Sequence, residues 1–490
     1  MKNNSSGKSL TVLILAVALL TILSVVDWHM LTGGRISNFS LIEDICYVND
    51  TISTEMQSQP GADLIDPALV AAMDEVTSEV ELPIHEVHPN KPINTPVKPA
   101  VTTDTIDTLL YEPQPAPKVA LISPKKVNGV LPIEDYTPDG SGLRRFAEAI
   151  DRRSGRRARI AVIGDSYIEG DIFTQDIRSM LQSEYGGKGV GYMSMHSDFP
   201  GFRRSVNQSD KGWTVIDMRN NSKDEIKPLS GEYCIGSVGS VVTFKGSKLD
   251  HADKWTSTNL IFIAPADGII KVTTDQGVQD VSVEKSDDIQ SIKIEAETTK
   301  ITLSSQINGL KVLGAWLEDD FGVGVDCMSL RGNSGVTHRA LSVKTAREMN
   351  EYVPYDLIVV EYGLNALSAQ QSNYTSYSKL MAQVIDRIKE CYPSADILML
   401  GVGDRGHKKG SSVSSMTTVE AMISAQRNCA RDCGIMFWDT REAMGGVDAI
   451  VDWRQRGLVN ADYIHLNHKG GGELAKEFVK ALKLKINETL

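Results

Sequence analysis

Two stretches of the chain, residues 141–203 and 318–490, alternate short apolar runs with amphipathic helical patterns, and this alternation constrains the fold most. The runs ARIAVIGDS, YDLIVVEYGLN, ADILMLGVGD and IMFWDT are typical of buried strands. Longer segments with helical spacing separate them, as in YSKLMAQVIDRIKECYP. Alternating strands and helices predict an α/β fold, in which helices cover both faces of a parallel sheet.

Residues 204–317 interrupt this pattern. They contain short segments rich in β-branched residues, such as TNLIFIAPA and GIIKVTTD, separated by Gly, Asp, Asn and Ser. Such segments are typical of an antiparallel β-sandwich. Because strand–helix units stand on both sides, we predict a sandwich inserted between two parts of one α/β domain, 141–203 and 318–490.

The N-terminus predicts a membrane anchor. Residues 10–26, LTVLILAVALLTILSVV, form an uncharged apolar run at the short limit for spanning a bilayer. Lys2 and Lys8 precede it, so residues 1–9 should stay in the cytoplasm. A cleaved signal peptide is the alternative, although no Ala-x-Ala site follows. We expect a single-pass protein of the inner, cytoplasmic membrane, with its main domain in the periplasm or cell envelope.

A proline-rich tether is predicted for residues 27–140. Thirteen of the 18 prolines lie between residues 60 and 138. Proline favours extended polyproline geometry, so this segment should act as a semi-rigid spacer between membrane and main domain.

Composition argues against two classes of function. The net charge of −12 disfavours a nucleic-acid partner, which needs a basic face. Among the six cysteines only Cys429 and Cys433 are close, and no second Cys/His pair has zinc-site spacing. We therefore expect neither a metal nor another cofactor.

Residues able to perform nucleophilic catalysis follow the predicted strands, where functional groups of parallel sheets gather. Ser166 follows the first strand in GDSYIEGD, Asn365 follows YDLIVVEYG, and Asp462 and His465 lie three apart before the last helix. A serine nucleophile needs a histidine base, which a carboxylate orients. Asn365 and the backbone N–H of Ser166, at a predicted helix start, could stabilise an oxyanion together with a glycine N–H.

These motifs resemble those of the SGNH, or GDSL-type, hydrolases. GDSYIEGD resembles their first block, RGNSGVT the second, YGLNA the third and DYIHLN the last. The resemblance implies a flavodoxin-like α/β fold, catalytic Ser166, Asp462 and His465, and an oxyanion hole of Ser166, Gly335 and Asn365. Gly332 is the alternative glycine. One departure is Ala366, where the family usually has an aspartate after the asparagine.

One branch of that family is the most similar. The segment FWDTREAMGGVDAIVDWRQRGLVNADYIHLNHKGGGELA resembles the C-terminal part of peptidoglycan O-acetylesterases, which also carry an inserted sandwich resembling a carbohydrate-binding module. The resemblance covers about residues 141–490. It implies a serine esterase that removes O-acetyl groups from an envelope polysaccharide, with peptidoglycan as the first candidate.

Other functions stay open on the sequence alone. A polysaccharide O-acetyltransferase would use the same residues with a sugar hydroxyl as acceptor, and a non-catalytic glycan-binding protein would rely on the sandwich. Lipase or thioesterase activity is also compatible with the motifs.

Several other polar residues are predicted to lie on the surface or in loops. These are His196, His338, His407 and Asp404, of which His338 could line a substrate cleft. His468 should point away from His465.

Overall fold

The computed structural model describes residues 69, 125–151, 156–220, 223–410 and 412–490. The predicted anchor at 10–26 lies outside the described residues, as does most of the predicted tether. Among the residues that are described, no helix is both long and apolar enough to cross a bilayer.

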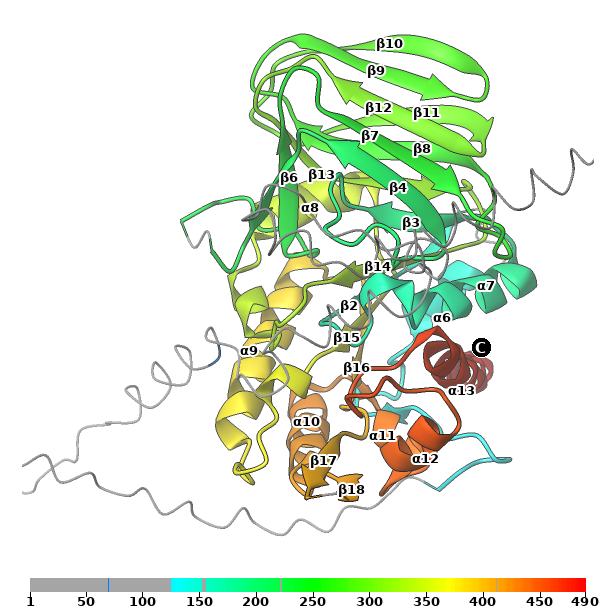
Figure 1. The fold of residues 1–490 in the computed structure, drawn as a ribbon, viewed down its shortest axis with the longest axis vertical. Coiled ribbons are helices and arrows are strands. Elements are labelled where there is room, and N and C mark those ends of the chain that lie inside the picture. Colours follow the sequence, from blue (N-terminus) through cyan, green and yellow to red (C-terminus); the bar gives the residue numbers. More distant parts are fainter. Residues whose placement is uncertain (1–68, 70–124, 152–155, 221–222, 411) are drawn as a thin grey trace, which may run out of the picture. The chain divides into compact units, whose positions relative to one another are not determined.

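A six-stranded sheet forms the centre of the α/β part (Figure 1), in the order β1-β19-β16-β15-β2-β14. All neighbouring strands are parallel except the edge pair of β1 and β19. Taken in chain order, the five parallel strands follow the 2-1-3-4-5 arrangement of flavodoxin-like sheets, as predicted. The strands are β1 (Glu134–Asp135), β2 (Ala158–Gly164), β14 (Val323–Ser329), β15 (Leu357–Glu361), β16 (Asp396–Leu400) and β19 (Met436–Trp438).

Two sets of helices lie on the opposite sides of this sheet (Figure 1). One set is α8 (Val343–Tyr352), α9 (Thr375–Cys391) and α10 (Val419–Cys433); the other is α6 (Arg144–Ile150), α7 (Thr174–Tyr185) and α13 (His468–Thr489). Each set is in contact within itself. The hairpin of β17 (Gly406–Lys409) and β18 (Ser412–Ser415) follows β16, the third predicted strand. The short helices α11 (Thr440–Met444) and α12 (Ala449–Gln455) follow β19, the fourth predicted strand.

The inserted segment forms two antiparallel sheets, which Figure 1 shows above the α/β part. One sheet has the order β10-β9-β12-β7-β4, and the other has the order β11-β8-β13-β6-β5, with β3 also paired to β13. A separate hydrophobic core, including Trp255, Phe244 and Phe262, fills the space between them. The strands are β3 (Gly189–Met193), β4 (Val206–Lys211), β5 (Thr214–Asp217), β6 (Glu232–Gly236), β7 (Val241–Gly246), β8 (Trp255–Ile263), β9 (Gly268–Thr274), β10 (Gly277–Val283), β11 (Gln290–Thr298), β12 (Lys300–Ser305) and β13 (Leu310–Glu318).

The sandwich and the α/β part share buried contacts. Trp316 on β13 donates its indole N–H to Asp326 Oδ2 on β14 at 2.7 Å, and the backbone N–H of Tyr192 donates to Asp326 Oδ1 at 2.9 Å. Trp316 and Ile261 also belong to the hydrophobic core of the central sheet. The sandwich therefore packs on the central sheet as a fixed part of the fold.

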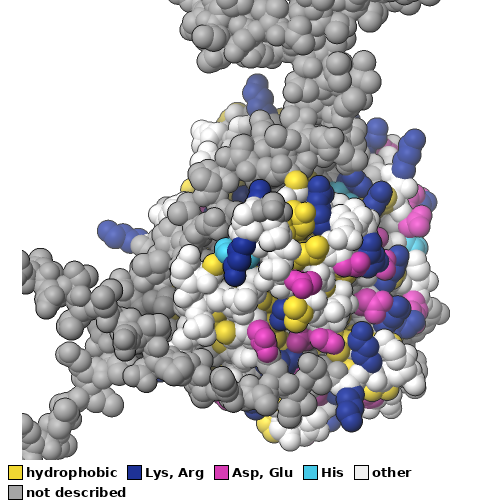
Figure 2. Space-filling view, turned by 60° about the horizontal axis from the view of Figure 1, so that its bottom comes forward, with side chains coloured by type: hydrophobic (Ala, Val, Ile, Leu, Met, Phe, Trp, Pro, Cys, Tyr) yellow, Lys and Arg dark blue, Asp and Glu magenta, His cyan; other side chains and the backbone are white. Residues whose placement is uncertain are grey.

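Two strands lie outside the segments predicted for their sheets, and a third strand was not predicted. β1, at 134–135, adds to the central sheet from within the predicted tether, and β3 joins the sandwich from within 141–203. The strand β14 was not predicted, although it pairs with β2 along its whole length. Figure 2 shows basic and acidic side chains intermixed on the described atoms of one face.

Candidate active site

Ser166 stands at the carboxyl end of β2, a strand whose seven residues are all buried. The Asp165 side chain accepts the backbone N–H of Tyr167 at 2.9 Å, which turns the chain sharply after the strand. A short 3-10 turn, η2 (Glu169–Asp171), follows, and α7 begins only at Thr174. The prediction that Ser166 occupies a helix start is therefore wrong, and a helix dipole contributes little to this site.

His465 and Asp462 come from the loop between α12 and α13. The backbone N–H of Asn460 donates to the His465 carbonyl at 2.9 Å, which closes this loop. His465 Nδ1 lies 2.7 Å from Asp462 Oδ2, and Asp462 Oδ1 accepts the backbone N–H groups of Ile464 and His465 at 2.9 and 3.1 Å. The Asp462 carboxylate therefore fixes both the loop and the imidazole ring.

The three predicted catalytic side chains form one continuous chain of hydrogen-bonding contacts. His465 Nε2 lies 2.9 Å from Ser166 Oγ, on the ring edge opposite Asp462. Ser166 is 8% exposed, and the side chains of His465 and Asp462 are about a fifth to a quarter exposed. With the Nδ1 proton donated to Asp462, Nε2 is free to accept the serine proton.

Electrostatics keep Asp462 ionised. Burial alone would raise the pKa of Asp462, but the hydrogen bond and charge of His465, with the two backbone N–H groups, hold that pKa below its usual value. An ionised Asp462 stabilises the imidazolium that forms when His465 takes a proton.

The predicted oxyanion donors lie beside the serine but already have partners. Asn365, in the 3-10 turn η4 (Leu364–Ala366), donates its amide N–H groups to Asp165 Oδ2 at 2.8 Å and to the Asn333 carbonyl at 3.1 Å. The Gly335 N–H donates to Asn333 Oδ1 at 2.9 Å. Asn333 thus holds both donors in place. Gly332, the alternative glycine, lies beside the Arg219 side chain.

Two buried carboxyl groups lie beneath the serine. Burial raises the pKa of Asp165 to about 6, against the opposing hydrogen bond from the Tyr167 N–H, the charge of His465 and the Asn365 amide. Burial and the charge of Asp165 raise the pKa of Glu361, at the end of β15, well above its usual value. This pair therefore favours a protonated carboxyl group under the site.

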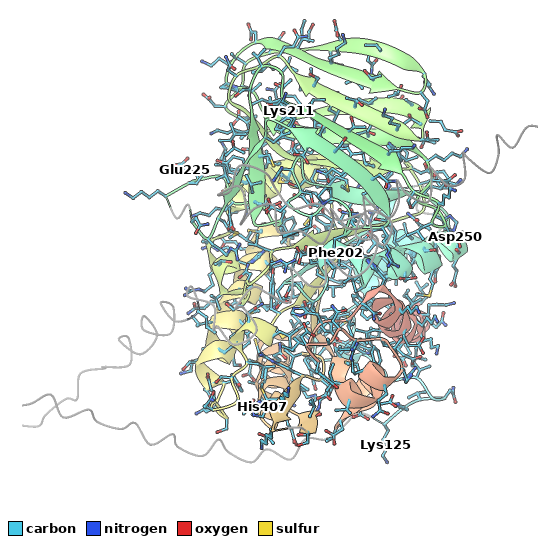
Figure 3. The ribbon with its side chains drawn as sticks, in the orientation of Figure 1. Lys125, Phe202, Lys211, Glu225, Asp250 and His407 are labelled. Atoms are coloured by element: carbon cyan, nitrogen blue, oxygen red, sulfur yellow. The ribbon has the colours of Figure 1, made fainter. Side chains whose placement is uncertain are left out.

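The remaining polar candidates do not join the site. Asp404 is fully buried, where it accepts from Ser415 and from Arg441, so its assignment to a solvated loop is wrong. His338 is also buried, with Nε2 3.1 Å from the Leu229 carbonyl, and does not line a surface cleft. His407 lies on β17, where Figure 3 labels it.

His196 and His468 both bind groups of the chain. His196 lies between the Asp210 and Asp198 carboxylates, at 2.7 and 3.1 Å. His468 Nε2 is 3.1 Å from the Phe202 carbonyl, and Figure 3 labels Phe202 where sandwich and α/β part meet. As predicted, His468 takes no part in the line from Asp462 to Ser166.

Sequence reasoning missed Asn333 and the second role of Asp165. Both lie inside the quoted motifs, and both have short side chains that accept a backbone N–H two residues ahead. That local bond is typical of asparagine and aspartate in turns. Their contact with Asn365, however, depends on three separate strands and has no signal in the sequence.

Comparison with solved structures identifies the fold. A peptidoglycan O-acetylesterase structure matches with a TM-score of 0.60 and 22% identity, over 73% of this chain and 99% of that one. A family two carbohydrate esterase from Cellvibrio japonicus matches at 0.26 and 9% identity, over 58% and 98%, and an acetylxylan esterase from Geobacillus stearothermophilus at 0.25 and 16%, over 33% and 73%. The last two scores are too low to carry an argument.

No family model and no curated protein matches the sequence. The match to the peptidoglycan O-acetylesterase nevertheless includes the insertion as well as the α/β part, because it covers 73% of this chain and the α/β part alone is less than half of it. The resemblance inferred from the motifs is therefore confirmed at the level of the fold: the chain shares the fold of that peptidoglycan O-acetylesterase.

Proposed function

We propose that this protein is a serine esterase that removes O-acetyl groups from a polysaccharide of the cell envelope, with peptidoglycan as the substrate. The observation that carries the proposal is the line from Asp462 through His465 to Ser166, with contacts of 2.7 and 2.9 Å. This arrangement generates a serine nucleophile without a cofactor. The fold shared with a peptidoglycan O-acetylesterase supports the choice of substrate class.

The proposed reaction has two stages. Ser166 Oγ attacks the acetyl carbonyl carbon while His465 Nε2 takes the serine proton, and the carbonyl oxygen becomes an oxyanion. His465 then gives that proton to the departing sugar oxygen, which leaves an acetyl-serine. In the second stage His465 takes a proton from water, the water oxygen attacks the acetyl carbon, and acetate leaves as Ser166 is reprotonated.

The proposed oxyanion hole consists of the N–H groups of Ser166 and Gly335 and the Asn365 amide. In the structure, Gly335 and Asn365 donate to Asn333 and Asp165 instead. A developing oxyanion is a stronger acceptor than a neutral carbonyl or amide oxygen. We therefore expect these two donors to share their hydrogens with the substrate oxygen as negative charge develops there, while Asn333 keeps them in position.

We also propose that residues 10–26 anchor the protein in the cytoplasmic membrane, with the proline-rich segment 27–124 as a tether. The support is the uncharged apolar run, the preceding lysines and the clustered prolines. Membrane fractionation and protease treatment of intact spheroplasts test this. The anchored protein should sediment with membranes and be cleaved from outside.

The deciding experiment measures acetate release from O-acetylated peptidoglycan by the wild-type protein and by Ser166→Ala. Serine-dependent release supports the proposal. Hydrolysis of p-nitrophenyl acetate without acetate release from peptidoglycan would contradict this substrate, and transfer of acetyl to an added saccharide would favour a transferase. Equal release by both proteins would contradict the catalytic role of Ser166.

A further inference from the structure

An ion pair with no assigned role lies beside Ser166. Glu169 follows Ser166 by three residues, and Arg331 follows β14 in the loop that also carries Asn333. The backbone N–H of Leu330 donates to the Gly164 carbonyl at 2.8 Å, which holds this loop against the end of β2. Arg331 Nη2 lies 2.7 Å from Glu169 Oε2.

The pair is held in position from two sides. The Arg331 guanidinium carbon lies 5.2 Å from the centre of the Phe199 ring, in the segment between β3 and β4. Arg219, also from the inserted segment, donates Nη1–H to the Arg331 carbonyl at 2.6 Å, and two of its other nitrogens bind Asp217. The sandwich thus fixes the side chain and the backbone of Arg331.

The two side chains keep donors and an acceptor free for a ligand. They are 27% and 18% exposed, for Arg331 and Glu169 respectively. Among the described residues, the only polar partner of each side chain is the other one. Burial raises the pKa of Glu169, while the charges of Arg331 and His465 lower it, which places the pair within electrostatic range of His465.

The chemistry of the pair suits an uncharged sugar. A guanidinium edge donates to hydroxyl oxygens, and a carboxylate oxygen accepts hydroxyl protons. Because the two charges cancel, the pair has no net attraction for an anionic ligand. Two rigid polar groups that orient a ligand next to the reacting atoms are what a carbohydrate ester needs for positioning.

We propose that Glu169 and Arg331 form a sugar-binding subsite that recognises neighbouring uncharged hydroxyl groups of the saccharide whose ester lies at Ser166. The inserted sandwich acts through Phe199 and Arg219 to fix this subsite. The inference rests on the proposed function for the nature of the ligand, but binding can be measured without catalysis.

The test measures binding by calorimetry, using the full chain in detergent with Ser166→Ala so that no ester is cleaved. The probes are soluble O-acetylated peptidoglycan fragments and uncharged acetylated xylo-oligosaccharides. In the Ser166→Ala background, Arg331→Met should raise Kd at least tenfold for both probes. Glu169→Gln in the same background should also raise Kd for both probes. The matched control is Arg456→Met directly after α12, another arginine over an aromatic ring with a carboxylate partner, which should leave Kd unchanged.

Thermal unfolding first establishes that each variant is folded. If Arg331→Met is not folded, Arg331→Lys replaces it. Unchanged Kd values for a folded Arg331 variant would overturn the subsite, as would a loss confined to the charged fragments. Failure of Ser166→Ala to bind either saccharide at millimolar concentration would also overturn it. In that last case, serine-dependent acetate release by the wild-type protein would still support the proposed esterase.

Discussion

His465 Nε2 lies 2.9 Å from Ser166 Oγ, although 299 residues separate them in the sequence. The contact depends on the closing helix α13, which contacts α7 and α6 on one side of the sheet and so brings the 462–467 loop to the end of β2. Removal of the hydroxyl in Ser166→Ala should lower kcat for p-nitrophenyl acetate by about 10⁴-fold or more.

The control for that prediction is stability. Among the described residues, the Ser166 hydroxyl makes a hydrogen bond only to His465. The Ser166→Ala variant should therefore unfold close to the wild-type temperature, with a change in the free energy of unfolding no larger than that of an ordinary surface substitution. A variant that is folded and retains more than a tenth of wild-type activity would contradict the nucleophile assignment.

Asp462→Asn tests the orientation of the imidazole. An asparagine can still occupy the same space, but it places an amide where the carboxylate accepts the Nδ1 proton, so the ring adopts the wrong tautomer. We expect kcat to fall by about 10⁴-fold with KM nearly unchanged. Steady-state kinetics check this, and a fall in kcat smaller than tenfold would show that His465 is oriented by other contacts.

Asn365→Ala tests the oxyanion hole. Loss of one donor of this kind costs about 10²–10³-fold in kcat. The variant also frees Asp165 Oδ2 and the Asn333 carbonyl, which Asn365 now binds. If Asn365 is structural only, thermal stability will fall while kcat of the folded protein stays near wild type, so both quantities are measured.

The sequence was sufficient for the parts of the fold whose signal is local. The strands β2, β15, β16 and β19 are short apolar runs, and the residues after them carry the motifs of Ser166 and Asn365. The motif DYIHLN likewise contains both Asp462 and His465. Each of these was predicted because neighbours in the sequence suffice to recognise it.

The rest depends on partners far away in the chain. β14 was missed because VGVDCMS places Asp326 in the middle of a strand, where a charge ordinarily excludes burial. In the structure Asp326 is buried because Trp316, Tyr192 and Tyr355 all donate hydrogen bonds to it. Asp404 is a similar case, since its partners Ser415 and Arg441 come from later segments.

The buried Asp165 predicts a pH dependence of stability. Its folded pKa of about 6 lies above the unfolded value of ~3.9, so the unfolded chain releases this proton first as pH rises. Protonated Asp165 therefore contributes about 3 kcal/mol to the free energy of unfolding below pH ~4, and this contribution is lost as the pH rises to ~6. Asp165→Asn should remove this part of the slope. Urea unfolding at pH 4, 5, 6 and 7 tests it, and identical slopes for both proteins would contradict it.

Gly335 should tolerate no side chain. Its φ of +93° is a backbone conformation that disfavours residues with a Cβ, and a Cβ there would lie 2.7 Å from Cδ2 of the buried Tyr362 ring. Gly335→Ala should therefore lower the free energy of unfolding by about 2–4 kcal/mol and move the N–H that we assign to the oxyanion hole.

Gly457→Ala is the matched control, because Gly457 also has a positive φ of +71° but no heavy atom within 4 Å of the added Cβ. It should cost only about 1–2 kcal/mol, with full activity. Equal losses of stability and activity in the two variants would show that the Tyr362 contact and the Gly335 N–H are unimportant.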